Sequence, residues 1–176
     1  MLIIYTGNGK GKTTAALGSA CRAMGQGKRV LIVQFIKSPE WKSGEDYFFQ
    51  KPQVPSSKFQ ILKAGFGFVG ILGDKKPISA HRQAAEKALA FARRAIAGGK
   101  YDMIVLDEIN VAVDLKLLKA SDALRVLKQA PEEMILIFTG RGAPKSFIKK
   151  ADLVTEMREV KHPFNKKKCA RLGVEF

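Results

Sequence analysis

Short apolar runs alternate with helical repeats along this chain. Over residues 13–26 and 79–96, apolar residues recur every three or four positions, which predicts two amphipathic helices. Around them lie runs of consecutive apolar residues, a pattern typical of strands buried on both faces of a parallel sheet. These runs lie at about 2–5, 29–36, 101–108 and 134–139. Strands that alternate with helices predict an α/β fold with a mostly parallel sheet.

Weaker signals complete the predicted order of elements. Ser79 is the expected N-cap of the long helix that ends at Gly98-Gly99, and Ser121 is an expected internal cap. The further elements are a short strand at 59–62, a helical region to about Gln129, a short helix at 145–150 and a last strand near 153–160. The absence of a linker or repeat favours one domain over 1–176.

Two stretches lie outside this alternation. Residues 37–57 are polar and aromatic, and their breakers predict no regular element there; these are Pro39, Gly44, Pro52 and Pro55. A glycine-rich loop at 65–70 carries Phe66 and Phe68. Aromatic side chains on such a loop suit a flat apolar ligand, and packing onto the core is the open alternative.

The stretch Thr6–Thr14 connects the first strand to the first helix. Its glycines (Gly7, Gly9 and Gly11) allow a turn whose N–H groups point at an anion, at the positive end of the helix. Lys12 is expected to reach a phosphate, and the Thr13 hydroxyl a magnesium ion. Only three residues separate Gly7 from Gly11-Lys12, one fewer than in the usual phosphate-binding loop. The alternative is a surface turn before a helix.

Polar residues also follow the later strands, where ligands of open α/β sheets bind. Asp107-Glu108 ends the third long apolar run, and Arg141 follows the fourth. A carboxylate there is a candidate magnesium partner, and Arg141 a candidate contact of the polyphosphate. The alternatives are a helix N-terminal acidic pair and a surface arginine.

Composition narrows the possible partners. The net charge of +15 permits nucleic acid or a small polyphosphate as partner, and a lysine-rich solvated surface is the alternative. No apolar run approaches the ~20 residues that span a membrane. Two cysteines make a disulfide framework implausible, and Cys21 is expected to be a small core residue. We therefore expect a cytoplasmic protein.

With these motifs in order, the chain resembles the P-loop type ATP:corrinoid adenosyltransferases. The matching stretches span nearly the whole chain. They are GNGKGKTTAALG (7–18), VQFIK (33–37) with Gly44-Glu45, YDMIVLDE (101–108), TGRGAP (139–144), ADLVTEM (151–157), VKHPF (160–164) and the closing LGVEF. The compressed phosphate loop is part of this family pattern. The resemblance implies a P-loop NTPase-like (RecA-type) three-layer sandwich.

The resemblance also implies an activity: transfer of the 5′-deoxyadenosyl group of ATP to the cobalt of a reduced corrinoid, with triphosphate as the leaving group. Thr13 and Glu108 would hold Mg²⁺, for which Mn²⁺ could substitute, and Lys12, Glu108, Phe66 and Phe68 would be the catalytic residues. Phe66 and Phe68 would also bind the corrinoid. The implied ATP contacts are Gly7, Asn8, Gly9, Lys10, Gly11, Lys12, Thr13, Thr14, Arg22 and Arg141.

Three departures from the family pattern bear on this reading. Phe68 stands where relatives carry a tryptophan, so the apolar ring is kept but its indole N–H is lost. Relatives often have a segment ahead of the first strand that covers the site, so we expect a more open site here or closure by a partner subunit. The tail at 165–171 is unusually basic, which suits an acidic electron donor such as a flavodoxin or a solvated strand end. The family further suggests a homodimer.

Two other functions compete with the transferase. A nucleic-acid-dependent RecA-type P-loop ATPase fits the loop and the charge, although the sequence shows no aromatic platform for single strands. A corrinoid- or ATP-binding chaperone without catalysis would fit an altered aromatic loop. The family motifs favour the transferase and argue against nucleic acid as a partner.

Overall fold

The sheet of this protein is six-stranded and parallel throughout. The computed structural model describes residues 1–51, 54, 57–71, 73–162 and 170–174. The strands are β1 (Leu2–Thr6), β2 (Val30–Gln34), β3 (Phe59–Lys63), β4 (Met103–Asp107), β5 (Ile135–Thr139) and β6 (Leu153–Glu156). Their order is β3-β2-β4-β5-β1-β6, and every neighbouring pair is parallel. The predicted α/β fold is thereby confirmed.

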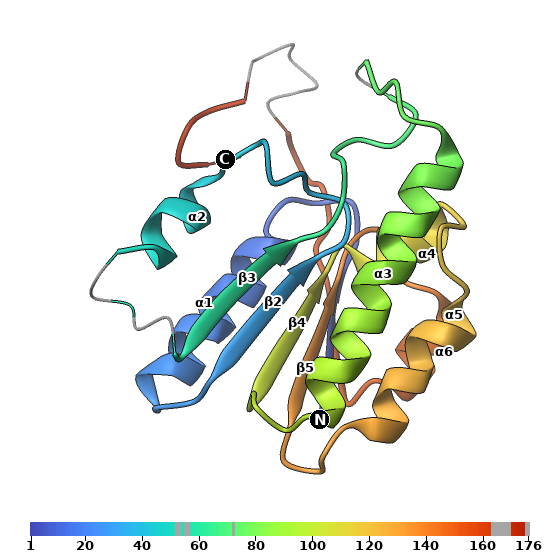
Figure 1. Ribbon diagram of the computed structural model, residues 1–176. Helices are drawn as coiled ribbons and strands as arrows, with labels where there is room; N and C mark the ends of the chain where they lie inside the picture. Colours follow the sequence, from blue (N-terminus) through green and yellow to red (C-terminus); the bar gives the residue numbers. More distant parts are fainter. Residues whose placement is uncertain (52–53, 55–56, 72, 163–169, 175–176) are drawn as a thin grey trace.

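Helices cover both faces of the sheet, which gives three layers (Figure 1). Helix α1 (Lys12–Gly25) packs on one face, where Val30 and Ile32 of β2 point. Leu31 and Val33 point to the other face, under α3 (Ile78–Ala97). The shorter helices are α2 (Gly44–Phe49), α4 (Ile109–Asp114), α5 (Ala120–Leu124) with the 3₁₀ turn Arg125–Gln129, and α6 (Lys145–Lys150). Burial on both faces explains the unbroken apolar runs.

Four details of the predicted elements are wrong. Residues 37–57 contain α2, which begins with a capping box in which the Ser43 N–H and the Asp46 carboxylate are 2.7 Å apart. Pro77, not Ser79, precedes α3, and Lys119, not Ser121, precedes α5. The last strand ends at Glu156.

Cys21 is exposed, so the prediction of a core residue is also wrong. Ala16, Ala20 and Ala23 form the buried stripe of α1 instead. Small side chains let this helix lie close to the sheet. Several stretches named above lie wholly or partly outside the described residues: Pro52, Pro55, 163–169 with Cys169, and 175–176.

The register lines up polar residues at one edge of the sheet. Gln34 of β2 pairs with Lys63 of β3 on one side and with Asp107 of β4 on the other. Tyr5 of β1 pairs with Thr139 of β5. Because all the strands run the same way, their carboxyl ends meet at this edge. No helix in the described part of the chain is long and apolar enough to cross a membrane.

Candidate active site

The loop between β1 and α1 rests on Met157, the residue that follows the edge strand β6. The Gly9 N–H donates to the Met157 carbonyl at 2.7 Å, and the Met157 N–H donates to the Thr6 carbonyl at 2.8 Å. A Cβ atom on Gly7 would lie 2.4 Å from the Met157 oxygen, and the φ of Gly7 is +93°. Two features therefore require glycine at position 7: the turn that the sequence indicates, and the close approach of the Met157 backbone directly after β6.

Lys12 is buried at the centre of this loop. Its ammonium donates to the carbonyls of Gly7 and Gly9 at 2.8 and 2.7 Å, and the residue is 7% exposed. Burial lowers the pKa of Lys12, and the positive charge of Arg141 lowers it further, while Glu108 and Asp107 oppose the shift. The predicted phosphate-binding lysine thus lies among the other charged residues that the sequence singled out.

Asp107 is the centre of the acidic side of the site. The hydroxyls of Thr13 and Thr139 both donate to its Oδ1 atom, at 2.9 and 2.6 Å, and the Gln34 side-chain amide donates to Oδ2 at 3.1 Å. The carboxyl group is fully buried. Sequence reasoning placed Asp107 beside a magnesium ion but assigned the metal to its neighbour Glu108. The contact between Thr13 and Asp107 joins α1 to β4, a pairing that no local pattern shows.

Glu108 follows in a left-handed backbone conformation with φ of 63°. Burial raises the pKa of its carboxyl group to about 7, and the charge of Asp107 raises it too, against the attraction of Lys12, Lys37 and Arg141. The structure therefore brings Glu108 into the same electrostatic neighbourhood as Lys12 and Arg141.

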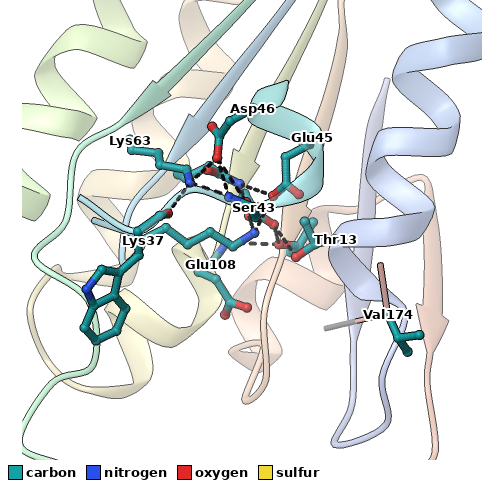
Figure 2. A network of polar contacts seen from close by, with 12 residues as sticks. Thr13, Lys37, Ser43, Glu45, Asp46, Lys63, Glu108 and Val174 are labelled. Atoms are coloured by element: carbon teal, nitrogen blue, oxygen red, sulfur yellow. Dashed lines mark hydrogen bonds and ion pairs between the residues drawn. The ribbon is translucent and has the colours of Figure 1, made fainter. Parts of the chain in front are cut away.

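Figure 2 shows a polar network that extends the site toward α2. The Lys37 ammonium lies 2.8 Å from Glu45 and 3.9 Å from Asp107. Burial alone would lower the pKa of Lys37, but the charges of Asp107 and Glu45 outweigh it and the pKa is raised. The hydrogen bond and charge of Lys37 in turn overcome burial and lower the pKa of Glu45 to about 2. Sequence reasoning assigned no role to Lys37 or Glu45, because the helix that carries Glu45 was not predicted.

The aromatic loop lies beside this network. The N–H groups of Gly65 and Gly67 donate to the carbonyls of Lys37 and Ile36, at 3.1 and 2.8 Å, so the loop is fastened to the chain after β2. Phe66 and Phe68 are 47% and 45% exposed, which excludes the alternative that they pack into the core. Phe66 contacts His81 edge-to-face, at 5.9 Å between ring centroids.

The remaining predicted residues are less closely grouped. Asn8, Lys10 and Thr14 are exposed on or next to the loop, and the Lys10 ammonium donates to the Val174 carbonyl. Arg141 is exposed after β5. Arg22 lies in the last turn of α1, ten residues beyond Lys12 and so about 15 Å along the helix from the loop. The structure does not bring Arg22 to the other predicted nucleotide contacts.

This parallel sheet, with a lysine-bearing glycine loop at the start of α1 and two carboxylates at the end of β4, defines an α/β protein of the P-loop NTPase-like class. The sequence model of one family, described as ATP:corrinoid adenosyltransferase BtuR/CobO/CobP, matches residues 1–176. The chain therefore belongs to the ATP:corrinoid adenosyltransferase family, as its motifs indicated.

Individual relatives agree with this assignment. The chain is 36% identical to the corrinoid adenosyltransferase of Escherichia coli K12 over 176 residues, which are all of this chain and 85% of that protein. The corrinoid adenosyltransferase CobA of Salmonella typhimurium gives the same figures. The corrinoid adenosyltransferase of Pseudomonas aeruginosa is 37% identical over 177 residues, covering all of this chain and 83% of that protein.

Proposed function

We propose that this protein transfers the 5′-deoxyadenosyl group of ATP to the cobalt of a reduced corrinoid, a step of adenosylcobalamin synthesis. Membership of the family over the full chain supports this function. The observation that carries it is the placement of two unlike surfaces at one edge of the sheet. A charged phosphate loop suits a nucleotide, and half-exposed aromatic rings suit a large apolar ligand.

The protein does not have to supply a nucleophile for this reaction, because the reduced cobalt is the nucleophile. The electron pair of Co(I) forms the bond to the 5′ carbon of ATP, the bond from that carbon to oxygen breaks, and triphosphate leaves with its electrons. The protein must hold the carbon in line and stabilise the charge of the leaving group. Lys12, with Lys10 and Arg141 nearby, supplies positive charge for the triphosphate. The reacting atom is thus the 5′ carbon of ATP, at the end of the triphosphate opposite to the γ-phosphate that ATPases hydrolyse.

We propose that a magnesium or manganese ion binds between Thr13 and Glu108. Its oxygen ligands would be the Thr13 hydroxyl and the Glu108 carboxylate, with Asp107 orienting Thr13 from 2.9 Å. The Gln34 Oε1 atom is buried and has no hydrogen-bond partner among the described residues, so it is available to a metal-bound water. The ion would neutralise charge on the leaving triphosphate.

Phe66 and Phe68 are the proposed corrinoid contacts. Following the family, we assign them the displacement of the lower axial ligand, which makes Co(II) easier to reduce to Co(I). Phe68→Ala should therefore slow a reaction that starts from Co(II) more than one supplied with Co(I). Equal losses in the two reactions would contradict this role.

One assay tests the function itself. The protein is incubated with ATP, magnesium and chemically reduced corrinoid, while the spectrum of the cobalt–carbon bond and the phosphate product are followed. We expect adenosylated corrinoid and triphosphate in equal amounts. Lys12→Ala should abolish transfer, and Lys28→Ala, an exposed lysine beyond α1, should not change it. Release of orthophosphate stimulated by DNA would overturn the proposal, and binding of both ligands without product would indicate a chaperone.

The remaining proposals concern the oligomeric state, the cellular location and the electron donor. We propose a homodimer that works in the cytoplasm and receives electrons from a flavodoxin-type donor. The family resemblance supports the dimer, and the net charge of +15 suits an acidic donor.

A further inference from the structure

Trp41 is a half-exposed ring placed against the aromatic loop. Its centroid lies 5.7 Å from that of Phe68, and the two rings are tilted by 56°. A Cβ atom on Gly67 would lie 3.3 Å from the indole, so the ring also covers the loop backbone. Trp41 is nevertheless 56% exposed. A large apolar ring left in water costs free energy that a second ligand can recover.

The backbone of Trp41 is held in place by a hydrogen bond from Lys63. The Lys63 ammonium donates to the Trp41 carbonyl at 2.7 Å and pairs with the Asp46 carboxylate at 2.5 Å. The Lys63 side chain is only 6% exposed and the Asp46 side chain 11%. Figure 2 shows Lys63, Ser43 and Asp46 together at this point. A nearly buried ion pair therefore holds the backbone of residue 41 at the end of β3, and Phe68 and Gly67 supply the contacts of the ring itself.

This position borders the nucleotide site. Lys63 is in register with Gln34 of β2, and Gln34 is in register with Asp107 of β4. Glu45 pairs with Lys37, whose ammonium also lies 3.9 Å from Asp107. The next residue, Asp46, pairs with Lys63, whose ammonium also donates to the Trp41 carbonyl. One turn of α2 thus carries two acidic residues: one pairs with the lysine beside Asp107, and the next pairs with the lysine that holds the Trp41 backbone.

We propose that Trp41 is a corrinoid-binding residue, which forms with Phe68 a two-ring apolar surface against the face of the corrin macrocycle. This rests on the proposed function, because the occupant is its second substrate. The rings come from segments 27 residues apart (41 and 68), and together they widen the apolar surface that Phe68 offers by itself. A flat conjugated macrocycle gains contact area from each ring that it covers.

The test compares Trp41→Ala, Trp41→Phe and Phe48→Ala. Phe48 is 48% exposed on α2 and contacts Phe49, so it is a matched control with an exposed ring outside the surface. We expect Trp41→Ala to raise the KM for Co(I) corrinoid about tenfold while the KM for ATP changes by less than about twofold. Trp41→Phe should restore most of the loss, and Phe48→Ala should match the wild type.

A binding titration separates this proposal from the proposed function. The visible spectrum of Co(II) corrinoid is titrated with protein in the presence of ATP, which needs no turnover. If the wild type binds corrinoid but forms no product, the proposed function fails while the role of Trp41 is still measured by the change in Kd. Equal affinities of the wild type and Trp41→Ala would overturn the role, as would equal increases of both KM values. A change of molecular mass by light scattering in Trp41→Ala would also overturn it, because the ring would then belong to an interface between two copies of the chain.

Discussion

At the scale of single residues, the pKa values of two carboxyl groups near Asp107 are shifted in opposite directions. Burial and the charge of Asp107 raise the pKa of Glu108 to about 7. Glu45 is also penalised by burial, but its contact with Lys37 lowers its pKa to about 2. The two pKa values differ because the two carboxyl groups have different charged neighbours. A 2.8 Å contact with an ammonium favours the charged form of Glu45, whereas Glu108 has a like charge as its neighbour.

We therefore expect Glu108→Gln to stabilise the free protein at pH 8. The raised pKa means that Glu108 contributes stability below its unfolded value of about 4.5, and this is lost as the pH rises through about 7. Glutamine resembles the protonated acid, so the variant should melt like the wild type at pH 4.5 and at a higher temperature at pH 8. Thermal unfolding followed by circular dichroism, without nucleotide or metal, measures both.

Glu45→Gln is the matched control and should behave oppositely. Because its pKa is lowered, Glu45 contributes stability above pH 4.5 that is lost only as the pH falls through about 2. The variant should melt below the wild type at pH 8. A lower melting temperature for Glu108→Gln at pH 8 would show that the attraction of Lys12 and Arg141 outweighs burial.

At the scale of elements, the phosphate loop depends on an edge strand that is distant in sequence. Gly7→Ala would place a methyl group 2.4 Å from the Met157 oxygen at a φ of +93°, so we expect a loss of about 2 kcal/mol or more in the free energy of unfolding. Gly18→Ala is the control, since Gly18 lies in α1 with open space around its Cβ position. It should gain about 0.5–1 kcal/mol. Urea unfolding measures both, and equal effects would argue against the contact with β6.

At the scale of the whole molecule, a net charge of +15 predicts electrostatic attraction of an acidic electron donor. With a flavodoxin as reductant, the rate from Co(II) should fall several-fold between about 0.05 and 0.5 M salt, because the Debye length shrinks below 10 Å. The rate with chemically supplied Co(I) is the control and should change little. Equal salt effects in both reactions would place the charge dependence at ATP or corrinoid binding instead.

Most of the fold could be predicted from the chain, because strands buried on both faces leave unmistakable apolar runs. The strands at 30–34, 103–107 and 135–139 and the helix at 145–150 lie where local pattern placed them. Helix α2 was missed because its stability comes from a capping box and from Lys63 and Lys37, contacts outside its own six residues. Cys21 was misplaced because one position around the helix separates the buried stripe from the exposed face.

By itself the sequence determined the family, and it singled out Lys12, Thr13 and Glu108 as candidate site residues, since each belongs to a local motif at the end of a strand or the start of a helix. Only the tertiary structure decided which of these residues touch. Parallel register brought Lys63, Gln34 and Asp107 into one row, β6 closed on Gly7, and residue 41 came to lie on Phe68. Such contacts join residues that are far apart in the chain, and their energies depend on packing and burial that no local pattern records.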